Sequence, residues 1–122
     1  MNTLPFAAAA CLLLGACATG PEPSSPYQLA SDTRTLAVLG ERLSQAHYEV
    51  RDLSEAGLAG EACARLAAQS EDLYEGAAIV VRLLESEAAI QAAPGGPAAL
   101  AAADNFSGII DEGILLEDEV CR

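Results

Sequence analysis

The 122-residue sequence contains no lysine and no tryptophan, and its six basic residues, all arginines, stand against eighteen acidic ones. The resulting net charge of -12 would repel phosphate backbones and anionic lipid headgroups. We therefore expect neither nucleic-acid binding nor a protein surface that binds membranes. Aromatic side chains are also few, so a folded core has to be built mostly from leucine, valine and alanine.

Motifs that would carry catalysis or a metal are scarce. His47 is the only histidine and lacks a metal-ligand spacing, so we predict it to be a surface or boundary residue. No C-x-x-C, Glu-x-x-His or Gly-x-Ser-x-Gly pattern occurs. The acidic residues 111–122 lack the calcium-loop pattern, and we interpret them as a solvated helix face. The sequence thus predicts no enzyme, no cofactor and no metal.

The start of the chain is an apolar run, residues 4–18, that contains Leu14, Gly15, Ala16 and Cys17. It is shorter than the roughly 20 apolar residues that span a bilayer, and its small residues suit cleavage. This segment resembles the lipobox of bacterial lipoprotein signal peptides. The resemblance implies cleavage between Ala16 and Cys17, a diacylglyceryl group on the Cys17 thiol and an acylated N-terminus at that cysteine.

The same resemblance implies a location. Ala18 follows the cysteine, and in enterobacterial lipoproteins a residue other than Asp at that place implies transfer to the outer membrane, facing the periplasm. The alternative is cleavage after Ala18, because residues 16–18 also fit an A-x-A signal. That cleavage would release a soluble periplasmic or secreted protein.

The rest of the chain divides into a linker and one domain. Residues 1–16 form the predicted signal peptide, and residues 17–30 the lipidated cysteine with a flexible, proline-rich linker. Residues 31–122 are enough for a single small domain and too few for two. Because no alternation typical of strands appears, we predict an all-α fold, a small antiparallel three-helix bundle.

The first predicted helix begins at residues 31–33, whose side-chain oxygens suit a cap, and ends at Gly57 or Gly60. The second covers about residues 62–92 and could break near Gly76 to give a fourth helix. The third follows the turn at residues 94–97. The predicted inward residues of the first helix, which we call the interaction seam, are Leu36, Leu39, Leu43, Ala46, Val50 and Leu53. The predicted inward residues of the third helix are Leu100, Ala103, Phe106, Ile110, Ile114 and Cys121.

Beyond Cys17 only two cysteines remain, Cys63 and Cys121, and the predicted compartment permits a disulfide between them. Straight helices would leave them about 10 Å too far apart. An extended segment at residues 97–100, or a bend near the start of the second helix, would close the gap. We predict the bond, with free core thiols as the alternative.

Two functions remain compatible with the sequence. The first is a lipid-anchored envelope protein whose acidic helical domain docks a partner protein or self-associates along the interaction seam. The second is a small periplasmic binding protein that holds an apolar ligand or lipid between its helices. The wide apolar arc of residues 79–84 motivates the second.

Overall fold

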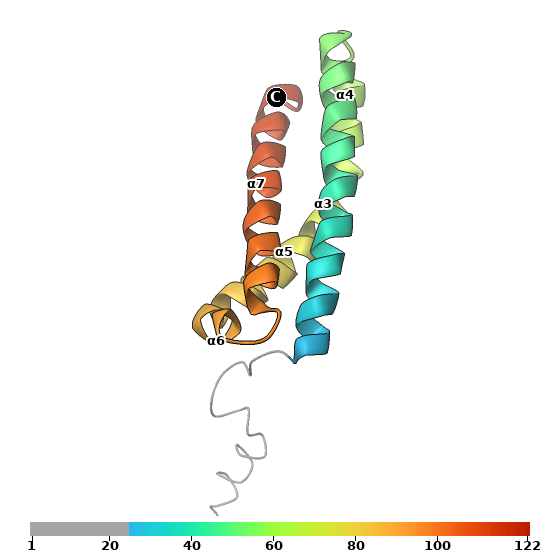
Figure 1. Cartoon of the computed structure of the whole chain (residues 1–122). Helices are drawn as coiled ribbons and strands as arrows, with labels where there is room; N and C mark the ends of the chain where they lie inside the picture. Colours follow the sequence, from blue (N-terminus) through green and yellow to red (C-terminus); the bar gives the residue numbers. More distant parts are fainter. Residues whose placement is uncertain (1–24) are drawn as a thin grey trace, which may run out of the picture.

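The computed structural model describes residues 25–122, which contain five helices and no strand. The helices are α3 (Pro26–Glu55), α4 (Ala59–Ala67), α5 (Ser70–Glu85), α6 (Glu87–Gln91) and α7 (Gly96–Val120). The two long helices, α3 and α7, lie side by side and run in the same direction, and α4, α5 and α6 lead the chain back between them (Figure 1). The all-α prediction is confirmed for these residues, with five helices in place of three or four.

The first helix begins earlier than the sequence pattern predicts. Its N-cap is Ser25, whose hydroxyl oxygen accepts a hydrogen bond from the Gln28 backbone N–H at 3.1 Å. Pro26 occupies the first turn, where its missing N–H has no role and its fixed φ suits a helix. Residues 31–33, the predicted cap, therefore lie inside α3, and residues 26–30 are helical rather than linker.

The returning segment is broken at two places, and neither is Gly76. One break falls between α4 and α5 at residues 68–69, and the other lies at Ser86. Gly76 lies inside α5, where a Cβ would overlap the ring of Phe106. The glycine therefore lets α5 and α7 approach closely around that ring. The expected break near Gly76 is wrong, because α5 runs through this position without interruption.

The turn before α7 forms as predicted, with Gly95 in the left-handed region at φ 79°. Ala103 and Phe106 face inward, but beyond Ile110 the buried positions are Gly113, Leu116 and Val120. The predicted inward residues Ile114 and Cys121 are exposed instead. Gly113 takes the inward place because it lies against the His47 ring of α3, which a larger residue would displace.

Two groups of buried apolar side chains hold the helices together. The larger one, which we call the first core, joins α3, α5, α6 and α7, and comprises Leu29, Leu36, Leu39, Leu43, Val80, Leu83, Ile90, Ala99, Ala103 and Phe106. The smaller one, the second core, lies toward the end of the molecule that holds the C-terminus, and comprises Val50, Ala62, Leu116 and Val120.

Candidate functional site

The interaction seam does not form a free surface. Leu36, Leu39, Leu43 and Val50 are each at most 2% exposed and belong to the two cores. Leu53 is half-buried against the second core. The seam was predicted from its alternating spacing of three and four residues, which is equally typical of a helix packed within its own chain. The helices of the same chain cover the seam, so a partner or a second copy could not dock on it without displacing them.

A partly enclosed concave surface lies where residues of the first core meet residues packed on the second. It is a cleft of about 230 Å³ lined by four of the helices, α3, α4, α5 and α7, and by the residues that join α4 to α5. Apolar side chains form most of its wall, and the exposed Tyr74 and Ile114 stand at its rim. The lining residues are Leu43, His47, Cys63, Leu66, Ala67, Gln69, Ser70, Leu73, Tyr74, Gly113, Ile114, Glu117 and Cys121.

This cleft does not lie where the sequence suggested a ligand. None of residues 79–84, the wide apolar arc, lines it. Within the arc Val80 and Leu83 fill the first core, whereas Val81 and Leu84 remain 55% and 49% exposed. The arc therefore covers one side of the core and leaves an exposed apolar strip on α5.

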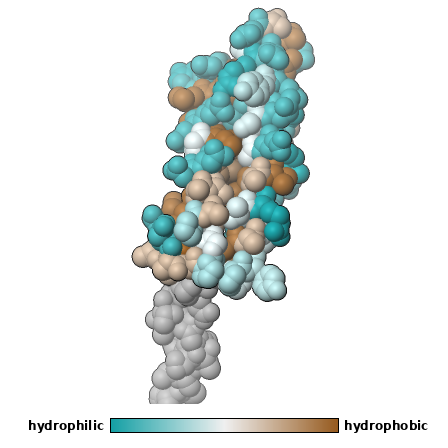
Figure 2. Space-filling model, in the orientation of Figure 1, coloured by the Kyte–Doolittle hydropathy of each residue, from teal (hydrophilic) through white to brown (hydrophobic). Residues whose placement is uncertain are grey.

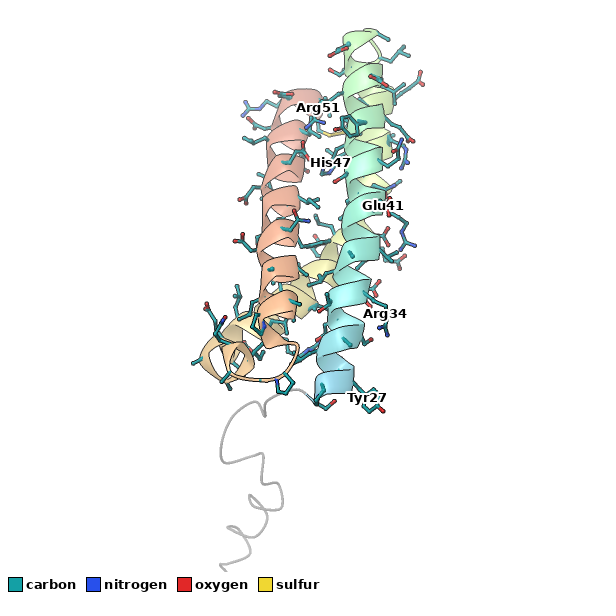
Figure 3. The ribbon with its side chains drawn as sticks, in the orientation of Figure 1. Tyr27, Arg34, Glu41, His47 and Arg51 are labelled. Carbon is teal, nitrogen blue, oxygen red and sulfur yellow. A yellow bond between two sulfur atoms is a disulfide. The ribbon has the colours of Figure 1, made fainter. Side chains whose placement is uncertain are left out.

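His47 is buried in the wall of the cleft, at 1% exposure, and is not the surface or boundary residue that we predicted. Its Nδ1 lies 2.9 Å from Oε1 of Glu112 on α7, and Arg51, one turn farther along α3, binds the other carboxylate oxygen. Figure 3 shows His47 and Arg51 on the side of α3 that faces α7. A carboxylate 65 residues away in sequence thus allows a polar ring to be buried.

The Glu112 carboxylate determines which nitrogen of the neutral ring carries the proton. Burial raises the pKa of the Glu112 carboxyl, but hydrogen bonds from His47 and Arg51 lower it, and the net pKa lies below its ordinary value. Near neutral pH Glu112 is therefore ionised and can only accept hydrogen bonds. Nδ1 of His47 must carry a proton, which makes Nε2 of the neutral ring an acceptor.

The Nε2 atom has no hydrogen-bond partner among residues 25–122. It faces Gly113, where a Cβ would lie 3.3 Å from Nε2 and 3.5 Å from Cε1. Gly113 also lines the cleft, so the glycine leaves room beside the acceptor. Buried polar atoms are generally satisfied in proteins, and an unsatisfied one at a cleft wall indicates a place for a polar group from outside the chain.

The cysteine pairing predicted from the sequence is present, with Cys63 of α4 bonded to Cys121 at the end of α7. The two Cα atoms lie 5.0 Å apart, well within the reach of a disulfide. The expected mismatch in length does not arise because the break after α4 bends the returning segment near its start. Both cysteines line the cleft.

The predicted lipidation residue Cys17 and the cleavage residues Leu14, Gly15 and Ala16 lie outside the described residues. Within residues 25–122, none of the helices combines the length and the apolar character needed to cross a bilayer. In the same range no group of three or more histidine, cysteine or acidic side chains is placed to hold a metal ion.

Comparison of the chain with protein-family models, curated proteins and solved structures finds no match. The site therefore has to be interpreted from its own residues. Sequence reasoning found the cysteines but missed Glu112 and Gly113, which give His47 its partner and its space. Glu112 was missed because residues 111–122 as a whole were interpreted as a solvated helix face.

Proposed function

We propose that this protein is a lipid-anchored lipoprotein of the bacterial cell envelope, held in the outer membrane through Cys17 and facing the periplasm. Its helical domain serves as a non-catalytic interaction module for a basic partner protein. The proposed fold is an up-down-up bundle in which α4, α5 and α6 together form a broken second helix. The resemblance of residues 14–17 to a lipobox supports the anchor. The observation that supports the interaction module is that most of the arginines are paired with carboxylates of the same chain.

The arginines are largely committed to carboxylates of the same chain. Four ion pairs join different helices: Arg42 with Asp72, Arg65 with Glu49, Arg82 with Asp32, and Arg51 with Glu112. Arg122 pairs with Asp118 at the end of α7. With so few cations left, most acidic side chains on the surface have no internal counter-charge, which favours a partner of opposite sign. Figure 2 shows the hydrophilic side chains that cover much of one face.

One exposed face of α5 combines this charge with apolar contact area. Glu71 and Glu75 lie beside Tyr74, which is 73% exposed. Val81 and Leu84, the exposed strip described above, continue the face along the helix. The acidic side chains would attract a basic segment, and the aromatic and aliphatic side chains would bury apolar area against it. The face therefore suits a basic, amphipathic segment of a partner. We propose this face, and not the interaction seam, as the docking surface.

The anchor and the docking surface are tested together in cells. The full chain is compared with its Cys17→Ser variant for incorporation of labelled palmitate and for partners captured by in-cell crosslinking. We expect palmitate on the parent chain only, and capture of a basic envelope protein that depends on the anchor. Palmitate on the Cys17→Ser variant would contradict the lipidation site.

Charge reversal locates the surface. Glu71→Arg with Glu75→Arg reverses the charge of the α5 face, and Asp104→Arg with Asp111→Arg makes the same change at exposed positions of α7. We expect the α5 pair of substitutions to abolish the crosslink and the α7 pair to leave it. Equal effects of the two pairs would show that the net charge, and not the α5 face, recruits the partner.

A further inference from the structure

We propose that the cleft between the two cores binds a small, neutral, hydroxyl-bearing apolar molecule, which donates a hydrogen bond to Nε2 of His47. This inference does not depend on the proposed anchor or on the docking surface of α5. It rests on three features of the described residues: an apolar cleft, a buried nitrogen without a partner among them, and a glycine that leaves the space beside this nitrogen unfilled.

The size of the cleft limits the ligand. A cavity of about 150 Å³ holds benzene, with its six non-hydrogen atoms, so a cleft of about 230 Å³ suits roughly nine. Leu43, Leu66 and Leu73 supply apolar wall area from three different helices. A molecule with one ring and a short alkyl group matches both the volume and the character of the wall.

The acceptor fixes the ligand's polar group. Glu112 accepts from Nδ1, so in the neutral form of the ring the lone pair lies at Nε2, and a ligand that binds this form must supply a donor. A hydroxyl group meets this need without introducing charge. A carboxylate has no proton to donate to the neutral ring, and it would approach a chain of net charge -12 and the Glu117 side chain on the cleft wall. The chemistry therefore selects a phenol or an alcohol over an acid.

Gly113 is the residue on which access depends. A methyl group at this position would stand 3.3 Å from Nε2 and would take the space that a ligand oxygen needs. Gly108, on the same helix, offers a matched comparison, because a Cβ there meets nothing within 4 Å. Both changes to alanine raise helix propensity by the same amount, but only Gly113 lines the cleft. A difference between the two variants therefore reports on the cleft and not on the helix.

The only histidine of the chain provides a local measurement. The full chain, with its histidine labelled with ¹⁵N, is titrated with 4-ethylphenol, ethylbenzene and 4-ethylbenzoate, and the two imidazole nitrogen resonances are followed. We expect 4-ethylphenol to shift the Nε2 resonance saturably and more than the Nδ1 resonance. We expect ethylbenzene to bind roughly fivefold more weakly because it lacks the hydrogen bond, and 4-ethylbenzoate to leave the resonances unchanged.

The variants separate binding at the cleft from non-specific binding elsewhere on the chain. Gly113→Ala should weaken the response to 4-ethylphenol at least tenfold, whereas Gly108→Ala should match the parent chain, with both variants melting as cooperatively as the parent. The proposal is overturned if 4-ethylphenol leaves Nε2 unshifted in the parent chain. It is likewise overturned if Gly113→Ala responds as Gly108→Ala does, or if 4-ethylbenzoate binds as tightly as 4-ethylphenol.

Discussion

The two cores of this domain differ in the size and number of the side chains that fill them. The first core contains Phe106 and several leucines, and Gly76 brings α5 close to the aromatic ring. The second core has only Val50, Ala62, Leu116 and Val120, and beside it lie a cleft, a buried histidine and a disulfide. Small side chains bury little apolar area, so a covalent bond substitutes for packing at this end. The cleft is lined by residues packed on this second core, Cys63 and Leu66, as well as by Leu43 of the first.

Truncation of the central aromatic residue should have the largest effect. Phe106→Ala removes a fully buried ring from the first core, and we expect it to lower the free energy of unfolding by about 3 to 5 kcal/mol. Leu116→Ala in the second core should lie near the lower end for such truncations, about 2 kcal/mol, because fewer large side chains surround it. Urea unfolding of both variants measures the difference. Equal losses at the two ends would contradict the comparison.

Removal of the disulfide should come next. Replacing Cys63 and Cys121 together by alanine releases a loop whose ends are 58 residues apart, and we expect a loss of about 2 to 5 kcal/mol. The loss of stability should be larger for α4 and the last turns of α7, which the bond joins, than for α5 and α6, which the first core holds. Native-state hydrogen exchange, read by mass spectrometry, should show faster exchange at that end. Uniform acceleration would mean that the two ends unfold as one unit.

Much of the helical pattern could be predicted from spacing alone. The seam of the first helix, the turn at residues 94–97 and the cysteine pair are all local or pairwise features of the sequence. The use of the seam could not be predicted, because a three-and-four spacing is the same whether the partner helix belongs to the same chain or to another. Only the placement of α5 and α7 shows that the seam is filled.

The errors concern small residues and long-range pairs. Gly76 was predicted as a possible helix break, and Gly113 was given no role, but each permits a close approach, to Phe106 in one case and to His47 in the other. His47 was expected near the surface because a lone imidazole is costly to bury, and its partner Glu112 is 65 residues away. Sequence spacing within one helix carries no information about such contacts between helices.

The ion pairs extend the comparison to polar contacts. Asp32 is buried beside the first core, and two nitrogens of Arg82 donate to its oxygens at 2.9 and 3.1 Å. The same hydrogen bonds raise the pKa of Arg82. Asp32→Asn should lower the free energy of unfolding by about 1.5 to 3 kcal/mol, because it weakens charge-assisted hydrogen bonds to a buried group. The exposed pair of Arg42 with Asp72 provides the control, and Asp72→Asn should cost at most about 1 kcal/mol. Comparable losses in thermal unfolding would show that burial does not matter here.

The smallest effect should come from protonation beside the cleft. Glu112 has a folded-state pKa below its ordinary value of 4.5, so its stabilising contribution is complete above pH 4.5, where the carboxyl is ionised in both the folded and the unfolded chain. As the pH falls below 4.5 the unfolded chain takes up the proton first, and the contribution is lost as the pH passes through the lower folded value. The stability difference between the parent chain and Glu112→Gln should therefore be constant near neutral pH and shrink below pH 4.5. The groups that face Glu112 are His47 and Arg51, which contact its two carboxylate oxygens. The control is Glu75→Gln at an exposed position, whose stability difference from the parent chain should not show this decrease below pH 4.5. A Glu112→Gln difference that stays constant from neutral pH to pH 3 would mean that the carboxylate does not hold the His47 ring in place.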